Sequence, residues 1–332
     1  MQLNYAINII LIMGIFFLTG CERSSIPISK TRHTAVATYD ADISDDGAFA
    51  LVASVNHDAG YWDLEADVLL YNWSHSKERD IGIIAVDISP DGTRAVTATE
   101  DNMAVWDTSS GQNLGFYSLP ESDLRDIAIS DRGDSLVIGL GDGRVIHINL
   151  HTGRRLEFLA HGEAINSLDI SPNGRYVLSG GNDYRAIFWD SKTGQPLLEM
   201  EHNSRVTLVA LSRDGSRAFS SGIKADAFIW DIRSGAEISR LNLKDRQYVL
   251  SSARFSPDNQ NLLTGAPTRQ LVLWNANDGK VAKSIKVSAR HPNRPSGAII
   301  YAVGFSNNGD LLSESSAGFG ERWSVNIAPQ NP

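Results

Sequence analysis

The chain has 332 residues, of which 21% are charged, and a formal net charge of -9 at pH 7. A partner with a phosphate backbone requires a basic footprint, so this acidic balance excludes nucleic acid from the expected partners. The single cysteine, Cys21, excludes a disulfide within the chain.

The N-terminal segment predicts export and attachment to a membrane. The first twenty residues contain no charged side chain, and 9–18 is an almost wholly apolar run that is too short to span a bilayer comfortably. The following Leu18-Thr19-Gly20-Cys21 resembles the bacterial lipobox, in which the cysteine is diacylated and becomes the mature N-terminus. This resemblance implies a lipoprotein signal peptide at 1–20, and a lipidated Cys21 with a short tether at 21–24.

The residue after the acylated cysteine bears on the destination of such a lipoprotein. In sorting schemes of this kind an aspartate there favours retention in the inner membrane, and Glu22 leaves the destination open. We expect a lipid-anchored protein of the bacterial cell envelope, located at the outer membrane and facing the periplasm.

A turn signal recurs seven times along the remaining chain. Its last residues are Gly47, Gly92, Gly133, Gly174, Gly215, Asn259 and Gly309, each three positions after a serine, with spacings of 45, 41, 41, 41, 44 and 50. These spacings lie near the roughly 40–45-residue period of four-strand propeller blades. The chain is therefore predicted to be one domain built from repeated units.

The fourth unit shows the pattern most completely. Period-two alternation in 155–159 and 165–170 predicts antiparallel strands, and two further short apolar runs, 176–179 and 186–190, follow the turn. Each unit is therefore expected to supply about four strands.

The ends of these units resemble the WD-repeat family, whose repeats close on a Trp-Asp pair. This pair occurs at Trp106-Asp107, Trp189-Asp190 and Trp230-Asp231, with the variants Ile148-Asn149, Trp274-Asn275 and Trp323-Ser324. The resemblance implies an all-β fold over 25–327, a seven-bladed β-propeller of four-stranded antiparallel blades, followed by a C-terminal tail at 328–332.

The first unit is predicted to differ from the others. The aromatic position lies 14 or 15 residues after the turn in six units, whereas Tyr71-Asn72, assigned to this position in the first unit, lies 24 residues after Gly47. The excess predicts an inserted loop at 56–65.

The family resemblance also implies a set of residues that braces a blade. In the fourth unit these are His161, Ser179, Asp183 and Trp189, with the indole N–H linked through the hydroxyl to a His–Asp pair. The fifth unit keeps His202, Ser220 and Trp230 but has Lys224 where the aspartate is expected. His75, His147 and His151 are expected to be ordinary surface or core residues.

The N-terminal segment is predicted to close the ring of blades. No fourth strand follows Trp323, and 25–30 aligns with the outer strand of the fourth unit. We expect this segment to complete the seventh blade, because closure removes exposed sheet edges.

Departures from the repeat are the expected sites of binding, since loops on a rigid frame carry function. The loop predicted at 56–65 and a second one at 288–297 should emerge on the same face and meet. They combine residue types that dominate protein interfaces, which are Tyr61, Trp62, Arg290, His291 and Arg294. A charge run at 244–248 is a third candidate on that face.

We therefore expect a non-catalytic platform for protein partners, without cofactor or metal. No nucleophile elbow, zinc helix motif or phosphate loop is found, and 42–47 lacks the terminal glutamate of a calcium loop. The alternative is an enzyme or small-ligand binder that uses the central channel, hydrolase-like or metal-dependent. Inward-facing carboxylates or histidines at the channel mouth, with an ordered metal, would favour it. A quinone-cofactor enzyme is a weaker option, because its repeated tryptophan motif is not found.

Overall fold

The computed structural model describes residues 26–54, 58–75, 82–119, 123–224, 226–243, 249–291 and 297–325. Several predicted features lie outside these ranges: the signal peptide at 1–20, Cys21 and its tether at 21–24, Arg294, the charge run at 244–248, and the tail at 328–332. Within the described ranges, no helix is long or apolar enough to cross a membrane.

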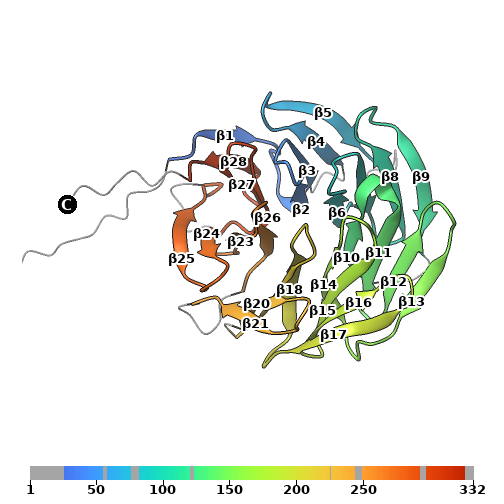
Figure 1. Cartoon of the computed structure of the whole chain (residues 1–332). Helices are drawn as coiled ribbons and strands as arrows, with labels where there is room; N and C mark the ends of the chain where they lie inside the picture. The colour runs from blue at the N-terminus through green and yellow to red at the C-terminus, as the bar shows by residue number, and fades with distance from the viewer. Residues whose placement is uncertain are drawn as a thin grey trace, which may run out of the picture.

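Seven four-stranded antiparallel sheets are arranged in a ring (Figure 1), which confirms the predicted seven-bladed propeller. Blade 1 contains β2 (Thr38–Ile43), β3 (Phe49–Ser54), β4 (Ala59–Asp63) and β5 (Val68–Trp73). Blade 2 contains β6 (Ala85–Ile88), β7 (Arg94–Ala98), β8 (Asn102–Asp107) and β9 (Asn113–Ser118). Blade 3 contains β10 (Leu124–Ile129), β11 (Ser135–Leu140), β12 (Val145–Asn149) and β13 (Arg155–Phe158). Blade 4 contains β14 (Ile165–Ile170), β15 (Tyr176–Gly181), β16 (Arg185–Asp190) and β17 (Gln195–Glu201).

The other three blades follow the same order from the inner to the outer strand. Blade 5 contains β18 (Val206–Leu211), β19 (Arg217–Gly222), β20 (Ala227–Asp231) and β21 (Glu237–Arg240). Blade 6 contains β22 (Ser252–Phe255), β23 (Asn261–Gly265), β24 (Gln270–Asn275) and β25 (Val281–Lys286). Blade 7 contains β26 (Ile300–Phe305), β27 (Leu311–Ser315), β28 (Phe319–Trp323) and β1 (Ser29–Arg32).

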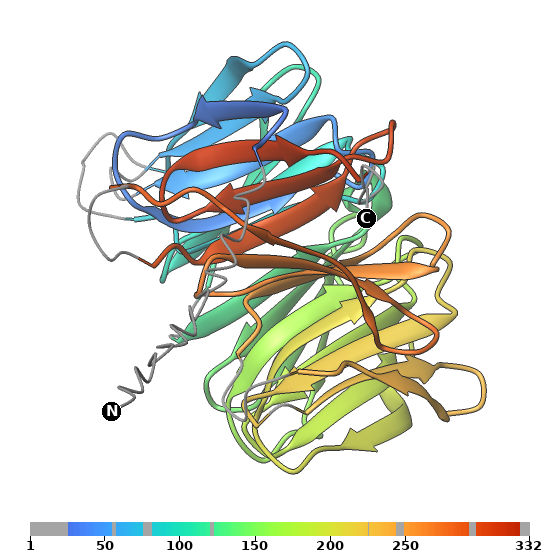
Figure 2. The same cartoon turned by 90° about the vertical axis from the view of Figure 1, so that its left-hand side faces the viewer.

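The last blade combines the two ends of the described chain. β1 pairs antiparallel with β28, with Ser29 opposite Arg322 and Arg32 opposite Phe319, and Figure 2 shows this blue strand beside the red ones. The strand begins four residues later than the segment 25–30 expected from the sequence. β2 also contacts β26, so the inner strands form a continuous ring.

The repeated turn has a local physical cause. In blade 1 the Ser44 Oγ accepts a hydrogen bond from the Phe49 N–H at 2.9 Å and donates one to the Asp46 carboxylate at 2.6 Å. The fourth residue has a positive φ, which is 66° at Gly47 and 57° at Asn259. Glycine and asparagine adopt that conformation with little strain, and this explains why they recur there.

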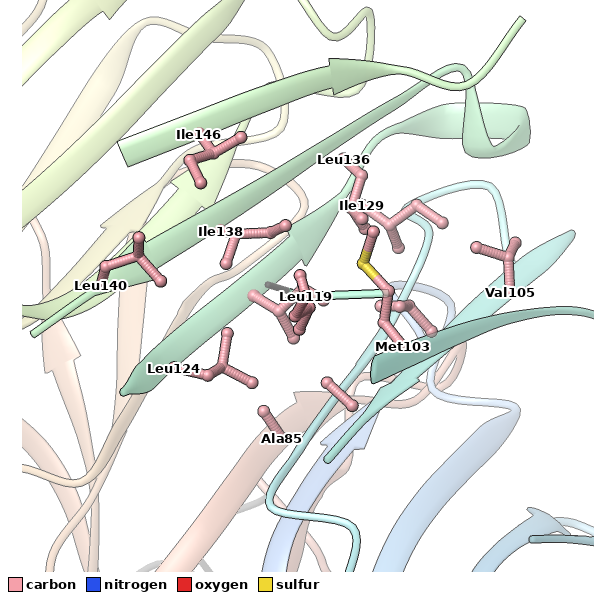
Figure 3. Packing of buried hydrophobic residues seen from close by; sticks show 13 residues of the cluster. Ala85, Met103, Val105, Leu119, Leu124, Ile129, Leu136, Ile138, Leu140 and Ile146 are labelled. Carbon is pink, nitrogen blue, oxygen red and sulfur yellow. The ribbon is translucent and has the colours of Figure 1, made fainter. Parts of the chain in front are cut away.

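The apolar core lies between neighbouring blades. Thirteen buried residues of blades 2 and 3 and their connection form one such layer (Figure 3), in which Met103 lies among Val105, Ile129 and Leu136. Because each sheet buries its faces only against the next one, the ring is the stable unit.

Antiparallel strands give the propeller two different faces. Connections from the first to the second strand and from the third to the fourth emerge on one side, which we call the turn face. Connections from the second to the third strand, and from each outer strand to the next blade, emerge on the other side, the loop face. The connections from Trp73 to Ala85, from Arg240 to Ser252 and from Lys286 to Ile300 are the long ones, and all three belong to the loop face.

Candidate functional site

The predicted loop at 56–65 is not formed in the structure. Residues Ala59–Asp63 are the strand β4, the third strand of blade 1, and Tyr61 is only 1% exposed. Tyr61 stacks between Phe49 and Trp73, with ring centroids 5.3 and 5.2 Å away. A side chain in this position stabilises the blade and cannot anchor a partner, so the interface prediction was wrong for Tyr61.

The first unit has its Trp-Asp equivalent at Trp62-Asp63, and not at Tyr71-Asn72. Trp62 lies 15 residues after Gly47, and the Asp63 carboxylate accepts the N–H groups of Glu65 and Ala66 at 2.9 and 2.8 Å. Asp190 makes the same two bonds, with Lys192 and Thr193, at 2.8 and 3.0 Å. The unit was misread because Asp67, with a φ of 60°, stands where the other turns have glycine.

Trp62 and the second loop are engaged elsewhere in the structure. Trp62 is half-buried and stacks on His33 with ring centroids 4.4 Å apart. In the 288–297 connection, Arg290 donates to the Ala35 carbonyl at 3.4 Å and His291 is exposed. Because 59–63 is a strand, the predicted meeting of two long loops does not occur. A binding role for Arg290, His291 and Arg294 stays a prediction.

The bracing set of blade 4 is assembled except at its indole. His161 Nε2 lies 2.8 Å from Ser179 Oγ, and its Nδ1 lies 3.0 Å from an Asp183 carboxylate oxygen. Burial opposes ionisation of Asp183, yet hydrogen bonding and charge from His161 lower its pKa overall. The Trp189 N–H has no hydrogen-bond partner among the described residues, so packing on Phe158, 4.1 Å away, holds this ring.

Two further bracing sets were missed or misassigned from the sequence. In blade 2, His75 contacts Thr97 Oγ1 at 2.6 Å and Asn102 at 2.8 Å, and the Trp106 indole donates to the same hydroxyl at 2.8 Å. His75 is therefore part of a bracing set. Asparagine in place of aspartate concealed it.

Blade 5 uses a different aspartate from the one sought. His202 Nε2 and the Trp230 N–H both reach Ser220 Oγ at 2.8 Å, and Asp226 accepts the Asn203 N–H at 2.8 Å. Burial lowers the pKa of His202 to about 4, against the opposing charge of Asp226. The aspartate lies two positions beyond Lys224, where a fixed spacing does not find it.

The central channel contains a carboxylate cluster that was not predicted from the sequence. Its cavity of about 460 Å³ opens among the turns of the turn face and is lined by Asp42, Asp87, Asp169 and Arg254. These four residues occupy one register position, two residues before the turn serine of blades 1, 2, 4 and 6. The repeated Asp-Ile-Ser at 42–44, 87–89 and 169–171 was the available signal.

These carboxylates, with Asp40 and Asp126 on the same strands, connect each blade to the next. Their oxygens accept backbone N–H groups at 2.7 to 3.1 Å from Val86, Ile88, Ile129, Leu168 and Leu211, each on the inner strand of the following blade. The bonds form a staircase around the channel from blade 1 to blade 5.

Two arginines close the turn-face end of the channel. Arg254 of blade 6 pairs with Asp42 at 2.7 Å and also with Asp45 of blade 1. Arg213 of blade 5 pairs with Asp45 and donates to the Pro90 carbonyl of blade 2 at 2.7 Å. The arginines therefore bridge blades that are not neighbours in the ring.

Burial shapes the protonation of this cluster. It raises the pKa of Asp126 and of Asp169 to about 7, although backbone N–H bonds act in the opposite direction. The pKa values of Asp40 and Asp87 are raised well above the usual range by burial and by neighbouring carboxylates. Within the described ranges, no group of three or more His, Cys, Asp or Glu side chains is arranged to hold a metal ion. The carboxylates are engaged in joining blades, and this geometry supports a structural role.

The loop face presents a different set of side chains. Exposed apolar and aromatic residues surround it, and they are Tyr39, Ile84, Leu159, Tyr184 and Val249. Tyr39 and Tyr184 are 50% and 51% exposed. Aromatic side chains with a polar tip are enriched at protein interfaces, so this face is the candidate binding surface.

Comparisons with known proteins agree with this architecture. Residues 153–190 match the family model described as WD domain, G-beta repeat. A chain in the crystal structure of a mitotic checkpoint complex aligns with a TM-score of 0.75 at 16% identity, over 98% of this chain and 100% of that chain. No curated protein matches the sequence. At this identity the structural likeness shows the fold alone, which is a seven-bladed propeller with a WD40 repeat at 153–190.

Proposed function

We propose that this chain is a lipid-anchored protein of a bacterial cell envelope and a non-catalytic platform whose partner proteins bind the loop face. The observation that carries the proposal is the difference between the two faces. The turn face consists of repeated tight turns around a channel closed by Arg213 and Arg254. The loop face has the long connections and the exposed Tyr39 and Tyr184.

The non-catalytic reading is supported by the channel itself. A channel enzyme or small-ligand binder needs carboxylates that are free to meet a substrate. Here Asp42 and Asp169 accept N–H groups from neighbouring strands, and Asp42 is also paired with Arg254. The anchoring part rests on the lipobox resemblance at Cys21, and Glu22 is compatible with the outer membrane facing the periplasm.

Site-specific photocrosslinking in intact cells tests the platform. A photoreactive phenylalanine analogue replaces Tyr39 or Tyr184 on the loop face, and Asn308, exposed in a turn-face loop, in the control. We expect the same protein adduct, identified by mass spectrometry, from positions 39 and 184 and no adduct from 308. An adduct confined to position 308 would assign binding to the other face and contradict the proposal.

The anchor has an independent test. Mass spectrometry of the mature chain should find an N-terminal Cys21 with acyl groups, in the outer-membrane fraction. The Cys21→Ser chain should appear in the water-soluble fraction. An intact N-terminus at Met1, or an unmodified Cys21 thiol, would refute the lipid anchor.

A further inference from the structure

The outer strands of the seven blades differ sharply in charge. Five of them carry two charged residues each: Lys30 and Arg32 in β1, Arg155 and Glu157 in β13, Glu199 and Glu201 in β17, Glu237 and Arg240 in β21, and Lys283 and Lys286 in β25. The outer strands β5 and β9 contain no charged residue. Charged side chains on edge strands normally prevent unwanted pairing, so two adjacent uncharged edges indicate a surface that is covered in the cell.

These two strands and the start of β1 expose a continuous set of apolar side chains. We call it the apolar crescent, and it consists of Ile28, Val68, Leu69, Leu70, Leu114 and Phe116, with exposed fractions from 41% to 56%. The residues belong to blades 7, 1 and 2, which follow one another in the ring (Figure 1). All six lie at or before the fourth residue of their outer strand, so the crescent follows the rim near the turn face.

Side-chain contacts hold the crescent together across the blades. Thr31 of β1 donates to the Asp67 carboxylate, directly before β5, at 2.8 Å. Between blades 1 and 2, Tyr71 donates to the Ser109 carbonyl at 2.8 Å and the Trp73 indole donates to the Gly111 carbonyl at 3.1 Å. The crescent is therefore a preformed surface and not three separate patches.

The N-terminus locates the membrane relative to this surface. The Ile28 N–H is bonded to the Arg322 carbonyl at 2.7 Å, so the chain joins blade 7 at one end of the crescent. Only the six residues 22–27 separate Cys21 from Ile28, and they span at most about 20 Å. An anchor at Cys21 thus brings the rim of blades 7, 1 and 2 to the bilayer.

We propose that the apolar crescent lies in the interface of the phospholipid bilayer that holds Cys21. This inference rests on the lipid anchor of the proposed function and adds an orientation to it. Exposed Lys30 and Arg32 of β1, beside the crescent, face the lipid phosphates. The rim near the turn face contacts lipid, and the loop face is directed away from the membrane, where partners reach it.

Single-cysteine labelling tests this orientation. Because Cys21 is the only cysteine and is consumed by acylation, one introduced cysteine receives a fluorophore selectively. The variants are Leu114→Cys in the crescent and Leu197→Cys on β17 of blade 4, which are 51% and 53% exposed. The acylated proteins are placed in phosphatidylethanolamine–phosphatidylglycerol vesicles that contain a nitroxide-labelled lipid as quencher.

We expect at least twofold stronger quenching at position 114 than at position 197. Equal quenching at the two positions, with the protein still bound to the vesicles, would overturn the inference and leave the anchor standing. A label at 114 that is shielded from water but not quenched by the lipid would also overturn it, because a second copy or another protein would then cover the crescent. If mass spectrometry finds Cys21 unacylated, the anchor itself fails and the inference falls with it.

Discussion

At the scale of single residues, the channel aspartates show how one side-chain type supports the ring. Asp169 accepts the Leu211 N–H of the next blade and its own following N–H, from Ile170, both at 2.7 Å. Such bonds fix the position of the neighbouring inner strand, and burial keeps the carboxyl hard to ionise. The residue serves packing and titrates near neutral pH at the same time.

This residue predicts a pH effect on stability. The pKa of Asp169 is raised to about 7 in the fold and lies near 3.9 in the unfolded chain. Its stabilising contribution is therefore complete below about pH 4 and is lost as the pH rises through about 7. Between pH 5 and pH 8 the free energy of unfolding of the wild-type chain should fall by about 1–2 kcal/mol relative to Asp169→Asn.

Urea denaturation at the two pH values measures this difference. Asp214→Asn is the matched control, because the pKa of this turn carboxylate is lowered by hydrogen bonds from Ser216 and Ser212 that outweigh its burial. The control should run parallel to the wild type between pH 5 and pH 8. A parallel course for Asp169→Asn as well would contradict the assignment.

At the scale of the element, the third strand of each blade decides how neighbouring blades pack. In blade 1 this strand contains Tyr61, and Trp73 of the next strand stacks on Trp106 of blade 2 at 5.0 Å. In blade 4 it contains Trp189, stacked on Phe158 of blade 3. The aromatic positions thus connect successive sheets, and this explains why they recur with the period of the repeat.

The Tyr61→Ala variant tests the corrected strand. Loss of a fully buried ring should reduce the free energy of unfolding by about 3–5 kcal/mol, as other buried aromatic truncations do. Tyr184→Ala removes the same side chain from a site that is 51% exposed, and should change stability by less than about 0.5 kcal/mol. Equal costs in urea denaturation would indicate that 59–63 is a loop after all.

At the scale of the whole molecule, the ring depends on the pairing of distant chain segments. β1 and β28 are nearly 300 residues apart in sequence, yet four residue pairs join them. Their pairing leaves the channel, the turn face, the loop face and the rim as surfaces with separate roles. The arginines in the channel mouth add contacts between blades 5, 6, 1 and 2.

Removal of β1 tests how much closure contributes. A chain that begins at residue 33 should lose about 2–4 kcal/mol relative to one that begins at residue 26, because the net value of each ladder bond is about 0.5–1.5 kcal/mol. It should also self-associate in size-exclusion chromatography, since β28 becomes an exposed edge. A shortened chain that stays monomeric with an unchanged urea midpoint would show that β1 is dispensable.

Much of the fold was predictable from the sequence because its signals are local. A serine that bonds the backbone of its own turn, followed by a residue at positive φ, marks each blade without reference to any other. The count of blades and their four-strand composition follow from the period of this turn. The first unit was misread for an equally local reason, since Asp67 replaces the glycine that ends the corresponding turn in other blades.

The sites depended on tertiary structure, because their partners come from other blades. The sequence alone determined the repeat, the number of sheets and the signature at Cys21. Only the folded ring decided that Asp169 faces Leu211, that Arg254 reaches Asp42 across blade 7, and that Tyr61 is buried. The reason is physical: a side chain in a propeller blade is buried, paired or exposed according to the neighbouring sheet, and that sheet lies some forty residues or more away along the chain.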